Sequence, residues 1–244
     1  MLLQDILSRV TVEEHKGELN IPISGVNIDS RRIEKDHLFI AVKGTQVDGH
    51  SFIDKAISQG ATAVLVCDPI PEVIPEGVTF VRVADTEDAV GKVATQFYGD
   101  PTSKLKLVGV TGTNGKTTIS RLVAELLMLQ GQKCAVMGTT GNGILPNLEA
   151  SSHTTLDALH LQTALHDYAV QGAQFAAIEA SSHGLEQGRL NGSNIEIAAY
   201  SNLSRDHLDY HGTLDAYAEA KAQLFAFSSL KVAIINLDDD YAAT

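Results

Sequence analysis

The stretch Lys106-Leu107-Val108-Gly109-Val110-Thr111-Gly112-Thr113-Asn114-Gly115-Lys116-Thr117-Thr118 decides the fold of the second half of the chain. Its first part, Lys106 to Val110, is an apolar run typical of a buried strand, and helical spacing continues from Lys116 to about Gln130. A glycine-rich loop between a strand and a helix is the architecture of a phosphate-binding P-loop. Its glycines let backbone N–H groups point at an anion, and the helix N-terminus adds partial positive charge.

The loop also carries the side chains that a nucleotide site needs. Lys116 supplies a full positive charge to the outer phosphates, and Thr117 offers a hydroxyl to Mg²⁺. One departure from the standard pattern is present, because the first glycine is at Gly109 instead of the position of Val110. A glycine-rich turn with a solvated lysine is the alternative. The residues expected to bind ATP are Gly112, Thr113, Asn114, Gly115, Lys116, Thr117 and Thr118.

Strand-like and helical segments alternate on both sides of the loop. The expected strands are residues 26–29, 37–43, 62–67, 78–83, 106–110, 133–137, 175–178, 195–200 and 231–235. The expected helices are 50–59, 87–98, 116–130, 156–171 and 214–227, with N-caps at Thr86, at Thr154 or Thr155, and at Thr213. This alternation predicts an α/β fold with a doubly wound, mostly parallel sheet. Gly99-Asp100-Pro101-Thr102 breaks the pattern, so we expect a small N-terminal α/β domain over 1–100 and a P-loop domain over 101–244.

Composition and charge restrict the partners and the compartment. The chain has 244 residues, a formal net charge of −12, and 18 lysines and arginines that form no cluster. Such a chain repels nucleic acid, so no nucleic-acid partner is expected. The N-terminus has no secretory signal and no apolar run approaches the ~18 residues of a membrane span, which predicts a cytoplasmic protein without membrane insertion. Cys67 and Cys134 lie in apolar runs and are expected to be free thiols.

Ligand-type side chains follow other expected strands. Glu179 comes directly after Phe175–Ile178, and because ligands collect at the carboxyl ends of parallel strands, its carboxylate is placed to reach Mg²⁺ beside Thr117. A solvated acid is the alternative. Residues 202–211, Asn-Leu-Ser-Arg-Asp-His-Leu-Asp-Tyr-His, are so dense in possible ligands that spacing cannot choose among them. Lys221, in Ala-Glu-Ala-Lys-Ala-Gln, has the sequence context of an ordinary exposed helix lysine.

Four separated motifs, in order along the chain, resemble those of the Mur ligases, and in particular the MurE type. They are the stretch from Asp29-Ser30-Arg31 to Asp48-Gly49-His50, the loop 111–118, Glu179-Ala180-Ser181-Ser182-His183-Gly184-Leu185, and 202–213. The resemblance implies an ATP-dependent ligase that adds the third amino acid of the peptidoglycan stem, by analogy meso-diaminopimelate, to UDP-N-acetylmuramoyl-L-Ala-D-Glu. In that family ATP phosphorylates the free carboxylate, and the amine of the amino acid attacks the acyl phosphate.

The resemblance also implies roles for individual residues. Gly112 to Thr118 would hold the ATP phosphates. Lys116, Glu179, His207 and Lys221 would form the catalytic set. The implied Mg²⁺ ligands are Thr117, Glu179, His207 and Lys221, the last as a carbamate (N6-carboxylysine), because an unmodified ammonium repels the metal. The positions that match substrate-contacting residues are Ile28, Ser30, Thr45, Gln46, Thr154, Thr155, Ser181, Gln187 and Arg189.

One departure from the family is large. Complete ligases have a third, C-terminal domain that selects the amino acid, and neither that domain nor the last elements of the central domain is expected after the strand at 231–235. We therefore expect this chain to bind the UDP-linked substrate without completing the ligation alone. Two alternatives remain. One is a folylpolyglutamate synthetase-like ligase, which shares the loop but lacks the UDP-sugar segment, and the other is a non-catalytic nucleotide-binding fragment.

Overall fold

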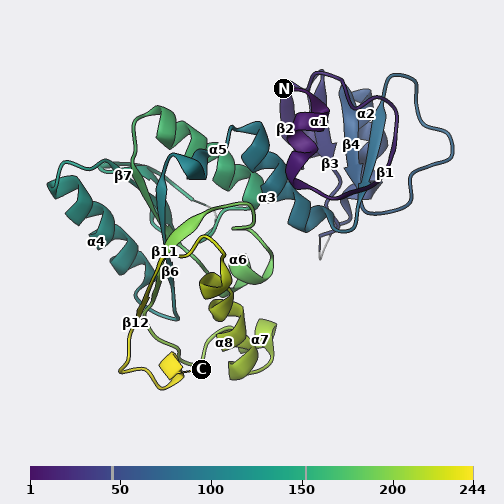
Figure 1. The fold of residues 1–244 in the computed structure, drawn as a ribbon. Coiled ribbons are helices and arrows are strands. Elements are labelled where there is room, and N and C mark those ends of the chain that lie inside the picture. The colour runs from purple at the N-terminus through teal and green to yellow at the C-terminus, as the bar shows by residue number, and fades with distance from the viewer. Residues whose placement is uncertain (45–46, 152, 244) are drawn as a thin grey trace. The chain divides into compact units, whose positions relative to one another are not determined.

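The chain folds into two compact units, Met1–Gly99 and Asp100–Thr244 (Figure 1). The computed structural model describes residues 1–44, 47–151 and 153–243. Each unit is built on one twisted, mostly parallel sheet, so the α/β fold class expected from the sequence is confirmed. Among the described residues, no helix has both the length and the apolar character needed to cross a bilayer.

The first unit contains a five-stranded sheet with the order β1-β5-β4-β3-β2. The strands are β1 (Val12–Lys16), β2 (Gly25–Asn27), β3 (His37–Ile40), β4 (Ala61–Val66) and β5 (Thr79–Val83). Strands β2 to β5 pair in parallel and β1 is antiparallel at the edge. The α-helices are α1 (Leu3–Ile6), α2 (Ile53–Ser58) and α3 (Thr86–Phe97). Phe39, Val64 and Phe80 of the sheet pack with Ala56 of α2 in a buried core.

The second unit contains a seven-stranded sheet with the order β12-β11-β6-β10-β7-β8-β9. The strands are β6 (Lys106–Thr111), β7 (Cys134–Gly138), β8 (Gly141–Ile144), β9 (Asn147–Glu149), β10 (Phe175–Glu179), β11 (Ile195–Tyr200) and β12 (Val232–Ile235). The helices are α4 (Lys116–Leu129), α5 (Ala158–Val170), α6 (Ser182–Glu186), α7 (Leu208–His211) and α8 (Leu214–Ala222), followed by the 3-10 turn η5 (Gln223–Ala226). The first five strands in the order are parallel, and the β8–β9 hairpin is antiparallel.

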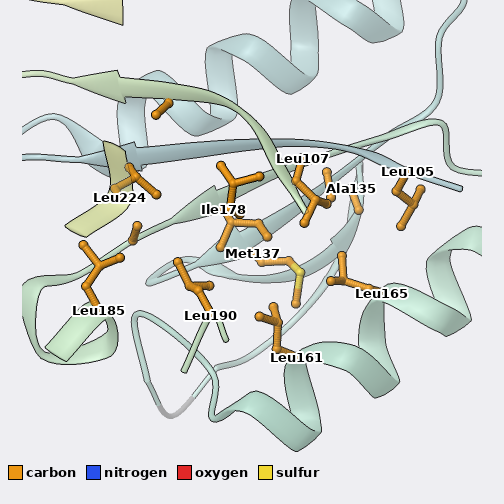
Figure 2. Close-up of a cluster of buried hydrophobic side chains, with 14 of the residues drawn as sticks. Leu105, Leu107, Ala135, Met137, Leu161, Leu165, Ile178, Leu185, Leu190 and Leu224 are labelled. Carbon is orange, nitrogen blue, oxygen red and sulfur yellow. The ribbon is translucent and has the colours of Figure 1, made fainter. Parts of the chain in front are cut away.

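Alternating residues of these strands face opposite sides of the sheet. On one side, Val108, Val136 and Ala177 lie under α4, whose Ala124 is fully buried. On the other side, Leu107, Met137 and Ile178 pack against Leu161 and Leu165 of α5 and Leu185 of α6 (Figure 2). Burying one leucine in such a core contributes about 1.5–3 kcal/mol. The two apolar layers stabilise the strands from which the loops at the carboxyl edge start.

Two of the expected helix caps are wrong. The N-cap of α3 is Asp85, whose carboxylate accepts from the N–H groups of Glu87 and Asp88, and not Thr86. The N-cap of α5 is Asp157, which accepts from the His160 N–H at 3.1 Å. Thr154 and Thr155 are therefore free for other contacts. The third cap is confirmed, because Thr213 accepts from the Ala216 N–H at 3.1 Å.

Candidate active site

The parallel register of the second sheet brings three strand ends together. Val110, the penultimate residue of β6, pairs with Glu179, the last residue of β10. On the other side of β6, Thr111 pairs with Tyr200, the last residue of β11. The loops that follow β6, β10 and β11 therefore start at one level of the same sheet edge, which is where parallel sheets bind ligands.

The loop after β6 has the shape that its glycines permit. Gly112 has a φ of 139°, and a Cβ there would lie 1.9 Å from Ser201 Oγ, so a larger residue cannot occupy the position. Gly115 has a φ of 88° and stands before the first turn of α4. Within the described part of the chain, the backbone N–H groups of Lys116, Thr117 and Thr118 donate to no protein acceptor. Three open donors at a helix N-terminus fit a phosphate group.

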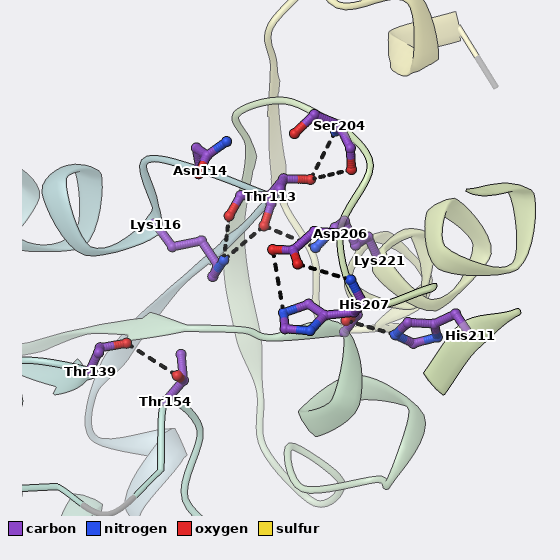
Figure 3. A network of polar contacts seen from close by, with 12 residues as sticks. Thr113, Asn114, Lys116, Thr139, Thr154, Ser204, Asp206, His207, His211 and Lys221 are labelled. Carbon is purple, nitrogen blue, oxygen red and sulfur yellow. Dashed lines mark hydrogen bonds and ion pairs between the residues drawn. The ribbon is translucent and has the colours of Figure 1, made fainter. Parts of the chain in front are cut away.

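Lys116 lies folded across this loop. Its Nζ donates to the carbonyl oxygens of Gly112 and Thr113, each at 2.9 Å (Figure 3). Burial lowers the pKa of Lys116, and the charges of Glu179 and Asp206 oppose that shift. An anion placed at the α4 N-terminus would restore charge compensation to this partly desolvated cation.

Glu179 is buried at the carboxyl end of β10, with only 1% of its surface exposed. Its carboxylate accepts from Thr117 Oγ1 at 3.0 Å, from the Thr139 N–H at 2.9 Å and from Thr139 Oγ1 at 3.2 Å. The side chain folds over Gly138, where a Cβ would lie 2.1 Å from Glu179 Oε1. Within the described ranges Glu179 has no ion-pair partner. A buried carboxylate surrounded by hydroxyl oxygens is a donor set that fits Mg²⁺.

Lys221 is also buried, with 2% exposure, and its Nζ donates to the Gly112 carbonyl at 2.9 Å. The ammonium lies 4.1 Å from the centroid of the Tyr217 ring. Burial, together with the charge of Lys116, lowers the pKa of Lys221 from 10.5 to about 7. The interpretation of Lys221 as an ordinary exposed helix lysine is therefore wrong. The residues that bury it lie elsewhere in the chain, so its local sequence does not show the burial.

His207 lies in the loop between β11 and α7, with a left-handed backbone at φ 51°. Its Nε2 is 3.6 Å from Asp206 Oδ2, and its ring contacts His183 edge-on. Figure 3 shows His207, Asp206 and Lys221 gathered beside Thr113 and Lys116. The structure thus brings His207 and Lys221 to the phosphate loop, and Glu179 to Thr117 at the α4 N-terminus.

The five substrate-matching residues of the second unit form one connected network. Thr155 Oγ1 donates to the Glu179 carbonyl at 2.7 Å and lies 2.9 Å from Ser181 Oγ. Thr154 Oγ1 lies 3.1 Å from Thr139 Oγ1, which contacts the Glu179 carboxylate.

The network continues to a guanidinium. Arg189 Nη1 donates to the Thr155 carbonyl at 2.7 Å, and its Nε and Nη2 both donate to Gln187 Oε1, at 3.1 and 2.6 Å. Gln187 in turn donates to the Tyr210 hydroxyl at 3.2 Å. Arg189 has only neutral acceptors in these contacts, which leaves its charge available to an anionic ligand.

The remaining substrate-matching residues belong to the first unit. Ile28 is half-buried and directly follows β2. Ser30 is buried and begins the 3-10 turn Ser30–Arg32, whose N-cap Asp29 accepts from the Arg31 N–H at 2.9 Å. Thr45 and Gln46 lie outside the described residues.

Sequence reasoning missed several residues of this site. Thr139 follows β7, and the Glu179 carboxylate accepts hydrogen bonds from both Thr139 and Thr117. Ser201 and Asn202 follow β11, and both form hydrogen bonds with Asn114 of the phosphate loop. The strand-end rule could have found Thr139, since it comes directly after an apolar run. No local signal distinguishes Asn202 from its polar neighbours.

Comparison with known proteins places both units in one family. A model of the Mur ligase middle domain matches residues 110–244, more than half of the chain, and a model described as Mur ligase family, catalytic domain, matches residues 22–98. UDP-N-acetylmuramoyl-L-alanyl-D-glutamate–2,6-diaminopimelate ligase of Phocaeicola vulgatus is 48% identical over 240 residues, covering 98% of this chain and 49% of its own length. The enzyme of the same name from Pseudomonas syringae is 46% identical over 220 residues, covering 90% and 45%.

Solved structures agree. A structure of a UDP-N-acetylmuramoyl-L-alanyl-D-glutamate–2,6-diaminopimelate ligase matches all of this chain and 48% of its own, with a TM-score of 0.85 and 52% identity. MurF from Acinetobacter baumannii, at 21% identity and a TM-score of 0.70 over 99% of this chain, shares the fold. The chain spans about half the length of the curated relatives it matches. With both units matched and the strand-end residues assembled, the chain belongs to the Mur ligase family, whose members are ATP-dependent carbon–nitrogen ligases.

Proposed function

We propose that this chain carries the UDP-substrate and ATP-binding parts of a MurE-type ligase. The reaction is the addition of meso-diaminopimelate to UDP-N-acetylmuramoyl-L-Ala-D-Glu, with ATP and Mg²⁺. Support comes from 44–48% identity to eight diaminopimelate-adding ligases over at least 90% of this chain. The proposal rests on three features together: the open N–H groups at the start of α4, a buried Glu179 that forms no ion pair among the described residues, and the network that connects Glu179 to Arg189.

The phosphate loop would hold the nucleotide. The N–H groups of Lys116, Thr117 and Thr118 would bind phosphate oxygens, and Lys116 Nζ would leave the carbonyls of Gly112 and Thr113 to contact the transferred phosphoryl group. Thr117 and Glu179 would hold Mg²⁺ between them, since their oxygens already lie 3.0 Å apart. Bound Mg²⁺ supplies charge neutralisation between the phosphates and the substrate carboxylate.

Lys221 would serve the same site as a carbamate. An amine must be neutral to attack CO₂, and a pKa of about 7 gives Lys221 a large neutral fraction at physiological pH. The new carboxylate would replace one of two cations that now share the Gly112 carbonyl. His207 would lie on the same side of the loop and complete the oxygen and nitrogen donors around the metal.

Arg189 would bind the carboxylates of the muramoyl dipeptide. Gln187 holds the guanidinium by two N–H groups, and the Thr155 carbonyl holds a third. Thr155, Thr154 and Ser181 lie between Arg189 and Glu179, so a carboxylate bound along this row would point toward the phosphate loop. Ile28 and Ser30, with Thr45 and Gln46, would contact the UDP-sugar in the first unit.

Isothermal titration of the 244-residue chain tests the proposal. UDP-N-acetylmuramoyl-L-Ala-D-Glu should bind, and a tetrahydrofolate should not. Arg189→Ala should weaken the UDP-dipeptide much more than UDP alone, because the arginine is assigned to the peptide carboxylates. Preference for the folate would favour a folylpolyglutamate synthetase-like ligase instead. Equal loss for UDP alone and for the UDP-dipeptide would contradict the role given to Arg189.

A further inference from the structure

A second chain of hydrogen bonds connects the turn after β12 to the phosphate loop. It starts at Asp239, in the turn after β12. The Asp239 carboxylate accepts from the Tyr200 hydroxyl at 2.6 Å, from the Leu203 N–H at 2.9 Å and from the Tyr241 N–H at 3.1 Å. Three donors converge on one carboxylate, and two of them belong to the end of β11 and the loop that follows it.

Asn236 fixes the same loop from its other side. Its Nδ2 donates to the Ser201 carbonyl at 2.8 Å, and its N–H donates to the Tyr200 carbonyl at 3.2 Å. The turn after β12 therefore holds Tyr200, Ser201 and Leu203 by four hydrogen bonds.

The segment 201–204 then holds the phosphate loop. Asn202 contacts both polar groups of Asn114, since its Oδ1 accepts from the Asn114 N–H and its Nδ2 donates to the Asn114 carbonyl, each at 3.1 Å. The Asn202 carbonyl accepts from the Thr113 N–H at 2.7 Å. Ser201 Oγ donates to the Asn114 carbonyl at 2.6 Å. Figure 3 shows the next link, from Thr113 to Ser204, where the Ser204 N–H donates to Thr113 Oγ1 at 2.9 Å.

These contacts determine which N–H groups of the loop face a ligand. The N–H groups of Thr113 and Asn114 are turned to Asn202, whereas those of Lys116, Thr117 and Thr118 stay open. We propose that Asp239 is a positioning residue for the nucleotide site: it fixes segment 201–204, and that segment fixes the backbone of Thr113 and Asn114. The inference rests on the proposed ATP site, and Asp239 contacts Tyr200, Leu203 and Tyr241, none of which is assigned to nucleotide or metal.

Asp239→Asn tests the proposal with almost no change in size. An asparagine lacks the charge that strengthens these hydrogen bonds, and it can accept from only one of the Leu203 and Tyr241 N–H groups, because these bond different oxygens of Asp239. Asp238→Asn is the matched control, since it removes the same charge from the exposed neighbouring residue. Tyr200→Phe removes only the hydroxyl that donates to Asp239. All three are made in the 244-residue chain.

Two readouts are needed. In hydrogen exchange, Asp239→Asn and Tyr200→Phe should speed exchange of the Thr113 and Asn114 amides at least tenfold, with the β10 amides 175–179 unchanged, which separates a local effect from loss of the fold. In titrations with Mg²⁺–ADP, Asp239→Asn should bind about tenfold more weakly than wild type, and Asp238→Asn should bind like wild type.

The outcomes separate the two proposals. If the wild type binds ADP, and Asp239→Asn has the same ADP affinity and the same amide exchange rates, the positioning role is overturned and the proposed ATP site stands. Equal acceleration of the β10 and phosphate-loop amides would also overturn it, because Asp239 would then stabilise the whole unit. No binding of ADP by the wild type would overturn the proposed ATP site of this chain, and the positioning role with it.

Discussion

Replacing Lys221 by Met tests whether a buried cation stands beside the phosphate loop. Lys221 is 2% exposed, and burial together with Lys116 lowers its pKa to about 7. In the unfolded chain the amine returns to its ordinary pKa of 10.5. The difference corresponds to about 5 kcal/mol of destabilisation when both states are protonated. Met has a similar length and no charge, so the variant should be the more stable protein by several kcal/mol at pH 6.

The difference in unfolding free energy between Lys221→Met and the wild type decreases as the pH rises. Between pH 7 and 10.5 the unfolded chain holds the Lys221 proton and the folded chain does not, so the free energy of unfolding of the wild type rises with pH. From pH 6 to pH 9 the advantage of Lys221→Met should shrink by about 2.5 kcal/mol, and below pH 6 it should stay constant.

Urea unfolding in CO₂-depleted buffer at pH 6, 7, 8 and 9 measures this. Lys104→Met is the control, because Lys104 is an exposed lysine of the same unit and its replacement should leave the pH dependence unchanged. A wild type and Lys221→Met whose stabilities follow parallel curves from pH 6 to 9 would refute the buried, neutralised amine and the carbamylation argument that depends on it.

Three further changes probe the metal, the substrate and the core. Glu179→Gln should abolish the increase in ADP affinity that Mg²⁺ causes, and ADP affinity without Mg²⁺ should be equal or slightly higher, since a carboxylate near the phosphates is removed. Titrations of ADP in EDTA and in Mg²⁺ measure both affinities, and an intact Mg²⁺ effect would contradict the Mg²⁺ site at Glu179. Arg189→Lys should weaken binding of the UDP-dipeptide at least tenfold, because an ammonium cannot replace the guanidinium held by Gln187; equal affinity would contradict the role given to the guanidinium. Leu161→Ala should cost 2–5 kcal/mol of unfolding free energy, as expected for a fully buried leucine in the core of Figure 2; a loss under 1 kcal/mol would indicate that the core relaxes.

The local sequence predicts most of the fold and part of the candidate site. The loop Gly112–Thr118 and the position of Glu179 followed from a strand, a glycine-rich turn and the strand-end rule, and the register of β6 with β10 puts Val110 beside Glu179. The β8–β9 hairpin and β1 were not predicted, because their short, polar or glycine-rich sequences have no clear period.

The remaining site residues depend on contacts far apart in the sequence. Lys221 has a polar, alanine-rich context, yet it is buried against Gly112, 109 residues away. Asn202 reaches Asn114 across 88 residues, and Asp239 reaches Tyr200 across 39. Hydrophobic periodicity predicts one helix or strand at a time, so it cannot show which loops a parallel sheet brings to the same edge. The resemblance to a family identified Lys221; only the structure identified Asn202, Thr139 and Asp239.

A crystal structure of the 244-residue chain grown with Mg²⁺ and a non-hydrolysable ATP analogue tests the central claim most directly. The phosphates should lie on the N–H groups of Lys116, Thr117 and Thr118, with Mg²⁺ bound to Thr117 Oγ1 and close to Glu179. Lys116 Nζ should have left the Gly112 carbonyl for a phosphate oxygen. A nucleotide bound elsewhere, or a phosphate loop still closed by Lys116 with the analogue in excess, would contradict the account.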